Sequence, residues 1–302
     1  STDCQTGAMA TYQLTAADRA SVPTSYPSEE RYLGYRDADE AKPYAKYFRA
    51  DALPMQAHVP EVLLTGMAPS EYGYDIDDAA RKLSRPGYHK METGWTVLDS
   101  GVVVVACRTE MPGVTGEMWD WWMGWHSCES ARYKLWHPDA HQFTAVGENR
   151  LSDRTLTDRQ RYVGNVSYVD EYVGGVLTPL AIRFVEPAEL GFEDSRPGST
   201  VIAGRVGLSV APIAFGWLVH QVRGTDSGAE MRSRFFLNHV EHLDLPAAAV
   251  ATPPAGRAPI AEGDPKSLGL GLLSHCAVEM NHLASFLPAL YEEFAEPATA
   301  RR

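Results

Sequence analysis

Five segments with the composition of β-strands follow one another along the chain, and one long helical pattern comes after them. Each strand-like segment is rich in β-branched and aromatic residues, and most have Gly or Pro at their ends; the segments are 162–172, 180–185, 200–208, 213–223 and 231–240. From Ser267 to Ala295, apolar residues recur at three- and four-residue intervals, which is typical of an amphipathic helix. Successive strands predict a curved antiparallel sheet, so we expect an α+β fold whose sheet and long C-terminal helix enclose a cavity.

A hairpin and a short helix are predicted ahead of these strands. Residues 95–98 and 102–108 flank Asp99-Ser100-Gly101, a pattern typical of a β-hairpin. The tryptophan-rich segment 115–126 begins with Thr115, which can cap a helix.

The remaining segments predict how the chain is divided. Residues 39–49 and 71–83 have helical patterns, and Pro and Ala are concentrated in 245–265, which predicts a long connection. We therefore expect a helical N-terminal part at 1–90 and a catalytic domain at 91–302.

The charge of the chain restricts its partners. Asp and Glu number 39 against 27 Lys and Arg, which gives a formal net charge of -12. This charge repels phosphate backbones and anionic headgroups, so we expect no nucleic acid and no membrane partner. The apolar runs are far shorter than the roughly 20 residues that cross a bilayer. Since no signal-peptide pattern opens the chain, we expect a cytoplasmic protein. The four cysteines are too scattered for a disulfide framework or a CxxC zinc module.

The sharpest chemical signal lies on the predicted C-terminal helix. His275 and Glu279 are four residues apart and share one helical face. Such a pair can bind one zinc ion, although it also occurs as a plain surface hydrogen bond. Leu272, Cys276 and Leu283 direct the same arc toward the interior, where a buried carboxylate needs a cation. The pattern therefore favours a metal site on this helix.

A second cluster of candidate side chains is the segment Arg132–His141. His137 and His141 are four residues apart, but Pro138 interrupts the helical spacing that would let both bind one ion. We expect at most one of the two to be a ligand.

Two further candidates lie on predicted strands. Alternation puts Asp170 and Glu171 on opposite faces, and Glu171 shares the face of Val169 and Val173, which favours it as the residue that points into a cavity. An acidic pair at the edge of a sheet is the alternative. His220 lies in an otherwise apolar strand, where a histidine is more often a core residue than a general acid.

Three motifs in order carry a resemblance to a known family. They are Met118-Trp-Asp-Trp-Trp-Met-Gly-Trp-His126, the segment Arg132–His141, and the late pair His275 and Glu279. Together they resemble the 2,4-diacetylphloroglucinol hydrolase and phloretin hydrolase family, over about residues 30–295. The resemblance implies a zinc-dependent hydrolase of carbon-carbon bonds. It also implies a helical N-terminal part and the helix-grip fold of the birch pollen allergen and START proteins, which agrees with the predicted sheet and terminal helix.

The resemblance implies a set of metal ligands. The metal of the family is held by two histidines and two glutamates, which fall on His141, Glu171, His275 and Glu279. The alignment at Glu171 is offset by about one residue, which leaves Asp170 as its alternative. The alternatives to His141 are His126 and His137.

The resemblance also implies residues that contact the substrate. The catalytic histidine of the family falls on His220, and its substrate-binding tyrosine falls on Tyr133. A second family tyrosine falls near Phe235 or Phe236, which have no hydroxyl. This departure from the family pattern would weaken one hydrogen bond to the substrate, so it bears on which acyl phenol the protein binds.

The reaction implied is hydrolysis of the aryl-acyl carbon-carbon bond of an acylated phloroglucinol or a phloretin-like polyphenol ketone. We expect Tyr133 and His220 to bind the ring hydroxyls and move a proton to the ring carbon, and zinc to polarise the acyl oxygen or activate water. An apolar cavity would hold the flat substrate, and the aromatic residues expected to line it are Trp122, Trp125, Phe215, Trp217 and Phe235.

The partners expected are a small-molecule acyl phenol and, through the N-terminal helices, at most a second copy in a homodimer. Two other functions compete with the hydrolase. One is a non-catalytic helix-grip carrier of a hydrophobic small molecule, and the other is a metal hydrolase of another ketone or of an ester.

Overall fold

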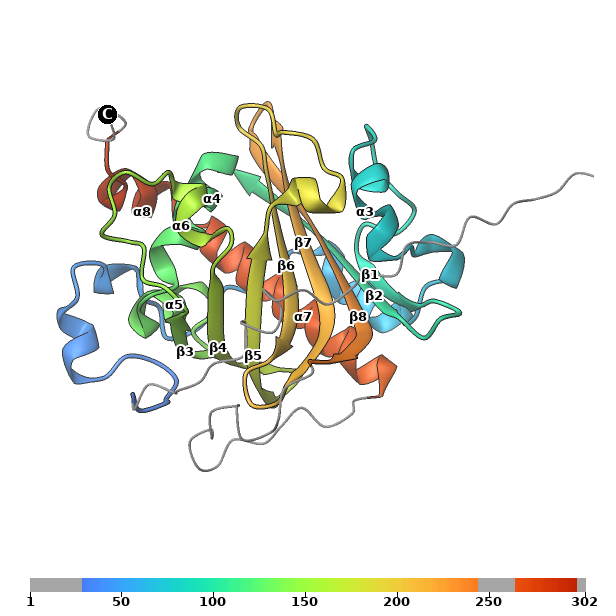
Figure 1. The fold of residues 1–302 in the computed structure, drawn as a ribbon, viewed down its shortest axis with the longest axis horizontal. Coiled ribbons are helices and arrows are strands. Elements are labelled where there is room, and N and C mark those ends of the chain that lie inside the picture. The colour runs from blue at the N-terminus through green and yellow to red at the C-terminus, as the bar shows by residue number, and fades with distance from the viewer. Residues whose placement is uncertain (1–28, 244–263, 298–302) are drawn as a thin grey trace, which may run out of the picture.

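A single eight-stranded antiparallel sheet forms the centre of the protein. The computed structural model describes residues 29–243 and 264–297, and the strands follow the order β1-β2-β8-β7-β6-β5-β4-β3 across the sheet (Figure 1). The strands are β1 (Gly94–Val97), β2 (Val103–Pro112), β3 (His141–Val146), β4 (Val166–Val173), β5 (Val176–Val185), β6 (Thr200–Leu208), β7 (Ile213–Thr225) and β8 (Gly228–His242). The predicted α+β class is confirmed, and so is its helix-grip arrangement of an antiparallel sheet packed on a long C-terminal helix.

The predicted strands are all present, with two corrections. The prediction that a strand starts at residue 162 was wrong, because Tyr162 ends the helix α6 (Asp158–Tyr162) and β4 starts at Val166. The strand β3 was not predicted. It starts at His141 and pairs with β4 through a register shift between His141 and Phe143.

Helices cover one face of the sheet, and α7 (Pro265–Ala284) crosses it (Figure 1). The others on this face are α4 (Gly116–His126), α5 (Ser130–Trp136) and α8 (Leu287–Phe294). The Thr115 hydroxyl accepts a hydrogen bond from the Met118 amide, so the predicted cap of α4 is confirmed. The prediction of one helix to residue 295 was wrong. The helix is interrupted at Ser285 and Phe286 because Pro288, in the first turn of α8, has no amide proton to continue the hydrogen bonds of α7.

The opposite face of the sheet carries a second, smaller core. Along β2, Val103 and Val105 belong to the core under α7, whereas Val104 and Ala106 belong to the other core, as the alternation of a strand requires. The helix α3 (Ile76–Leu83) buries its apolar residues there, and Asp75 caps it by accepting a hydrogen bond from the Ile76 amide. Each face of the sheet is therefore buried.

The segments before β1 are short helices. The prediction of one helical stretch over 39–49 was wrong, since Pro43 separates the two 3₁₀ helices Asp37–Ala41 and Ala45–Tyr47. The α-helix α2 (His58–Thr65) and the 3₁₀ helix Ser70–Tyr72 follow, and a further 3₁₀ helix, Pro187–Leu190, lies between β5 and β6. Most of the connection predicted at 245–265 lies outside the described residues. Within the described ranges, no helix has the length and apolarity to cross a bilayer.

Candidate metal centre

Backbone carbonyls orient two histidine rings. Nδ1 of His141, at the start of β3, lies 3.1 Å from the carbonyl oxygen of Tyr133, and Nδ1 of His275, on α7, lies 2.9 Å from that of Tyr172. A carbonyl oxygen only accepts hydrogen bonds, so each Nδ1 carries a proton and donates it. When such a ring is neutral, its Nε2 atom has a free lone pair, which is the arrangement that holds metal-binding histidines in place.

Two carboxylates face these Nε2 atoms. Oε2 of Glu279 lies 3.2 Å from Nε2 of His141 and 3.2 Å from Nε2 of His275. The carboxylate of Glu171, on β4, is slightly farther, at 3.4 Å from His141 Nε2 and 3.7 Å from His275 Nε2. In the described part of the chain, the ligand atoms of His141, His275 and Glu279 all lie within 4.8 Å of one another. All four side chains are buried.

The charges of this cluster favour a cation at its centre. Nε2 of His141 is buried and has no hydrogen-bond partner among the described residues, and burial lowers the pKa of His141 well below its usual value, so the ring is neutral. Burial lowers the pKa of His275 as well, but the charges of Glu279 and Glu171 outweigh it and raise the pKa to about 9, so without a metal ion the ring holds a proton whose place a cation would take. A lone pair directed at two buried carboxylates is unfavourable unless a positive charge lies between them. The donor set of two imidazoles and two carboxylates therefore fits a divalent metal ion.

Tyr133, on α5, contacts this cluster twice. Its ring stacks on that of His141 with centroids 3.8 Å apart, and its hydroxyl donates a short hydrogen bond to Oε2 of Glu171. Burial, and then the charge of Glu171, raises the pKa of Tyr133 well above its usual value. The hydroxyl therefore stays protonated at neutral pH and acts as a donor beside the cluster.

The cluster lies at the wall of a cavity of about 240 Å³ between the sheet and α7. Its walls are mainly apolar, and the polar groups include Tyr133, Glu171, His220, His275 and Glu279. The cavity is lined by apolar side chains that include Val169, Leu180, Phe184, Leu218, Phe235 and Leu272.

Three of the five aromatic residues expected in the cavity are not among its lining residues. Phe215 and Phe235 line it, but Trp217 is buried in the core on the opposite face, and Trp122 and Trp125 pack within the core under α7. Trp217 faces away because β7 has a register shift between Ala214 and Gly216, so residues 215 and 217 do not share a face. Trp136, which was not expected there, lines the cavity.

His220 reaches the cavity from β7. Its Nδ1 atom lies 2.7 Å from the hydroxyl oxygen of Ser233 on β8, and burial lowers its pKa to about 4. The imidazole is therefore neutral at physiological pH. The two phenylalanines left open as counterparts of the second family tyrosine lie on opposite faces, since Phe235 lines the cavity and Phe236 belongs to the other core.

The comparison with known proteins shows which family the chain belongs to. Residues 67–292 match the model of the DAPG hydrolase PhiG domain family. The chain belongs to this family of hydrolases. The 2,4-diacetylphloroglucinol hydrolase of Pseudomonas protegens is 34% identical to this chain over 287 residues, which cover 91% of this chain and 92% of that protein. The phloretin hydrolase of Eubacterium ramulus is 29% identical over 263 residues, which cover 86% of this chain and 93% of that protein. The family resemblance drawn from the sequence motifs is confirmed.

In this member of the DAPG hydrolase family, Asp170, His126 and His137 do not direct a ligand atom at the centre of the four-residue cluster. Asp170 is on the opposite face of β4, where Arg31 pairs with it at 3.1 Å. Nδ1 of His126 is bonded to the carbonyl oxygen of Trp122 at 2.7 Å. The ring of His137 lies 4.8 Å from that of His275, between centroids, but His137 does not belong to the group of converging ligand atoms.

Sequence reasoning missed the residues that hold the ligands in place. The carbonyls of Tyr133 and Tyr172 carry no side-chain signal, so sequence patterns do not reveal their contacts with His141 and His275. Ser233 was also missed, but its cross-strand position opposite His220 follows from the register of β7 and β8. Pairing of the predicted strands 213–223 and 231–240 as a hairpin would have suggested Ser233 as a neighbour of His220.

Proposed function

We propose that this protein is a zinc-dependent hydrolase that cleaves the aryl-acyl carbon-carbon bond of an acylated phloroglucinol or a phloretin-like polyphenol ketone. The products would be a phenol and a carboxylic acid. Membership of the DAPG hydrolase family and the names of two relatives support the reaction. The observation that carries the proposal is the cluster of two imidazoles and two carboxylates buried at the wall of an apolar cavity.

The proposed ligands are the four residues of that cluster. His141, His275 and Glu279 bring their ligand atoms closest together, and Glu171 completes the set from β4. When bound, a zinc ion polarises a carbonyl oxygen and lowers the pKa of a water molecule to about 7. Because imidazole and carboxylate ligands suit zinc, we propose Zn²⁺ as the ion.

Tyr133 and His220 are the proposed proton-transfer residues. A carbon leaving group is poor unless the ring carbon is protonated before the bond breaks, and a ring hydroxyl that loses its proton makes that carbon more basic. His220 is neutral at physiological pH and can accept the proton of a ring hydroxyl. Tyr133 stays protonated and donates its proton to Glu171, so its hydroxyl oxygen can accept a hydrogen bond from a ring hydroxyl of the substrate.

The apolar lining of the cavity supports this chemistry in two ways. It buries the flat ring of a phenol, and it keeps bulk water away from the reacting atoms. Phe235 stands in the cavity where the family resemblance suggests a tyrosine, so the hydrogen bonds to the ring hydroxyls would come from Tyr133 and His220.

A substrate panel tests the proposal. The purified protein is incubated with phloretin, with 2,4-diacetylphloroglucinol and with an aryl ester of similar size, and products are identified by mass spectrometry. We expect a phenol and a carboxylic acid from at least one of the two ketones. Hydrolysis of the ester alone would contradict carbon-carbon bond cleavage, and binding of the ketones without turnover would favour the carrier function.

Three further expectations stay predictions. They are the division of the chain into parts 1–90 and 91–302, a cytoplasmic location, and a homodimer. All six proposed site residues lie in the 91–302 part, which supports its assignment as the catalytic domain.

A further inference from the structure

Ser233 lies directly opposite His220 across the β7–β8 pair. The two residues are register partners, and the hydroxyl oxygen of Ser233 is 2.7 Å from Nδ1 of His220. Ser233 is only 1% exposed, and it is not among the residues that line the cavity. His220 therefore lies between Ser233 and the cavity, with Nδ1 directed at the strand and Nε2 left for the cavity.

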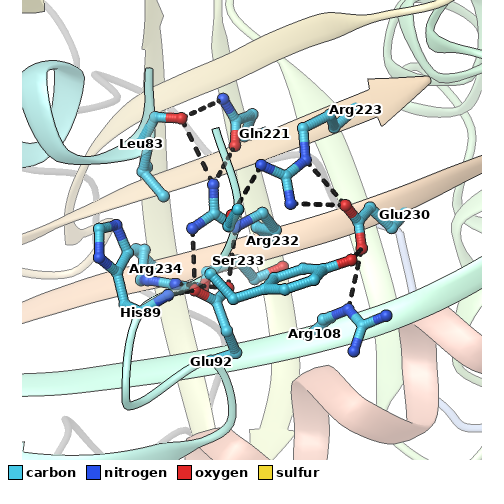
Figure 2. A network of polar contacts seen from close by, with 12 residues as sticks. Leu83, His89, Glu92, Arg108, Gln221, Arg223, Glu230, Arg232, Ser233 and Arg234 are labelled. Atoms are coloured by element: carbon cyan, nitrogen blue, oxygen red, sulfur yellow. Dashed lines mark hydrogen bonds and ion pairs between the residues drawn. The ribbon is translucent and has the colours of Figure 1, made fainter. Parts of the chain in front are cut away.

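The strand that carries Ser233 is anchored from its other face. Arg232 and Arg234 flank Ser233 and, by the alternation of a strand, point away from the cavity. On that opposite face, both guanidinium groups bind Oε1 of Glu92 at 2.8 Å (Figure 2). Arg234 also donates a hydrogen bond to the backbone carbonyl of Ser233 at 3.0 Å. Because both arginines are almost fully buried, the backbone at Ser233 is held at one position relative to β7.

Among the described residues, the Ser233 hydroxyl bonds to two uncharged side chains, those of His220 on β7 and Cys276 on α7. The register partner of Ser233 on β2 is Cys107, and burial is the cause of the lowered pKa of His220. A hydroxyl can hold an imidazole without stabilising the charged ring as a carboxylate would. The serine hydroxyl can also donate a hydrogen bond to Nδ1 when that nitrogen has no proton, or accept one when it has, because a hydroxyl carries both a proton and lone pairs.

We propose that Ser233 is a positioning residue, whose hydroxyl holds the His220 ring with Nε2 toward the substrate and satisfies Nδ1 in each protonation state that the ring passes through. This role rests on the proposed function, in which His220 moves a proton. In that reaction the proton of a ring hydroxyl passes to Nε2 of His220 and then to the ring carbon. Nδ1 keeps its proton during this transfer and donates it to the Ser233 oxygen, so no proton leaves through Ser233.

Removal of the hydroxyl tests the proposal. In Ser233→Ala we expect kcat to fall by about 10- to 100-fold, the loss typical when a residue that orients a functional histidine is removed. We expect KM within about twofold of wild type and unchanged zinc content, because Ser233 touches neither the substrate cavity nor the ligands. Ser233→Thr, which keeps a hydroxyl, should restore most of the activity, and Ser233→Cys, which keeps the size but bonds weakly, should not.

The matched control is Thr109→Val. Thr109 is a buried hydroxyl on β2, two residues from the register partner of Ser233, and it has no contact with His220. This isosteric change should leave kcat within about twofold of wild type, since it removes a hydroxyl from the same sheet without touching the proton-transfer residue.

Two readouts separate positioning from a general loss of structure. In a double-mutant cycle, Ser233→Ala should have no further effect in a His220→Ala background, because both changes act on one function. The ¹⁵N NMR shifts of the His220 ring should change in Ser233→Ala and stay as in wild type in Thr109→Val.

Unchanged ring shifts, or a kcat within twofold of wild type in an active enzyme, would overturn the proposal. If the wild-type protein turned over no acyl phenol, the proposed function would fail, and the NMR shifts alone would decide whether Ser233 orients His220.

Discussion

Tyr133 contacts His141 with its ring and with its backbone. The ring of Tyr133 stacks on the imidazole with centroids 3.8 Å apart, while its carbonyl oxygen accepts the hydrogen bond from His141 Nδ1. The hydroxyl of the same tyrosine donates to Glu171 on the other side of the cluster. One residue thus orients a proposed metal ligand and places a hydroxyl beside the proposed substrate, and the two contributions can be separated by mutation.

Tyr133→Phe removes the donor and keeps the stacking and the carbonyl. We expect zinc to bind about 10-fold more weakly, because Glu171 loses a hydrogen bond. At saturating zinc we expect a fall in kcat of about 10²- to 10⁴-fold, the usual contribution of a positioned proton-transfer group. Metal analysis and steady-state kinetics on the same sample check this. Full activity in Tyr133→Phe would exclude the hydroxyl from the reaction.

Neighbouring carboxylates on β4 give a matched pair of variants. Glu171→Gln should bind zinc at least about 10-fold more weakly, because it removes a charged oxygen that faces both imidazoles. Asp170→Asn alters the opposite face, where Arg31 pairs with Asp170, so zinc affinity should stay near that of wild type. Competition with a chelator measures both affinities. If Asp170→Asn weakened zinc binding as much as Glu171→Gln, or more, Glu171 would not be the ligand from this strand.

The network under β8 gives a prediction for acid stability. Burial raises the pKa of Glu92, but the hydrogen bond from Arg232 and the charge of Arg234 outweigh it and lower the pKa to about 2. A carboxylate with a lowered pKa stabilises the fold fully above its unfolded pKa of about 4.5, and this stabilisation is lost as the pH falls toward 2. Glu92→Gln should lower the free energy of unfolding by about 3 kcal/mol at pH 7, since two buried arginines lose their counter-charge.

Denaturant unfolding at pH 7 and at pH 3 measures this effect, with Glu148→Gln as the control. Glu148 forms an exposed pair with Arg150, so its loss should change the free energy of unfolding by less than about 1 kcal/mol. We expect the difference between wild type and Glu92→Gln to shrink at pH 3. A difference that grew as the pH fell would refute the charge on Glu92 as its cause.

Buried neutral histidines affect the free energy of unfolding in a higher pH range than Glu92 does. Burial lowers the pKa of His126 and of His220 to about 4, whereas an unfolded histidine titrates near about 6.5. The unfolded chain takes up these protons first, so stability should be highest above about pH 6.5 and fall as the pH drops to about 4. His126→Phe should reduce the slope over that range, as seen in unfolding curves at pH 7, 5.5 and 4.5. An unchanged slope would mean that His126 is not titrating as its burial implies.

Local patterns predicted the parts of the site that depend on local geometry. His275 and Glu279 are one helical turn apart, and Glu171 shares a strand face with two valines, so their common orientation follows from the spacing alone. His141 was harder, because β3 begins there after Pro138 and is recognisable only through its pairing with β4. The break before α8 and the orientation of Trp217 depend on Pro288 and on an irregularity in β7, which the apolar pattern does not show.

Zinc content and turnover measured on the same samples test the central claim most directly. The samples are wild type, His275→Ala, Glu279→Gln and chelator-treated wild type, each with phloretin and with 2,4-diacetylphloroglucinol. We expect about one zinc per chain and carbon-carbon bond hydrolysis in wild type, loss of both in the two variants and after chelation, and recovery when zinc is added back to wild type. Undiminished hydrolysis in the metal-free protein, or full zinc binding in both variants, would contradict the account.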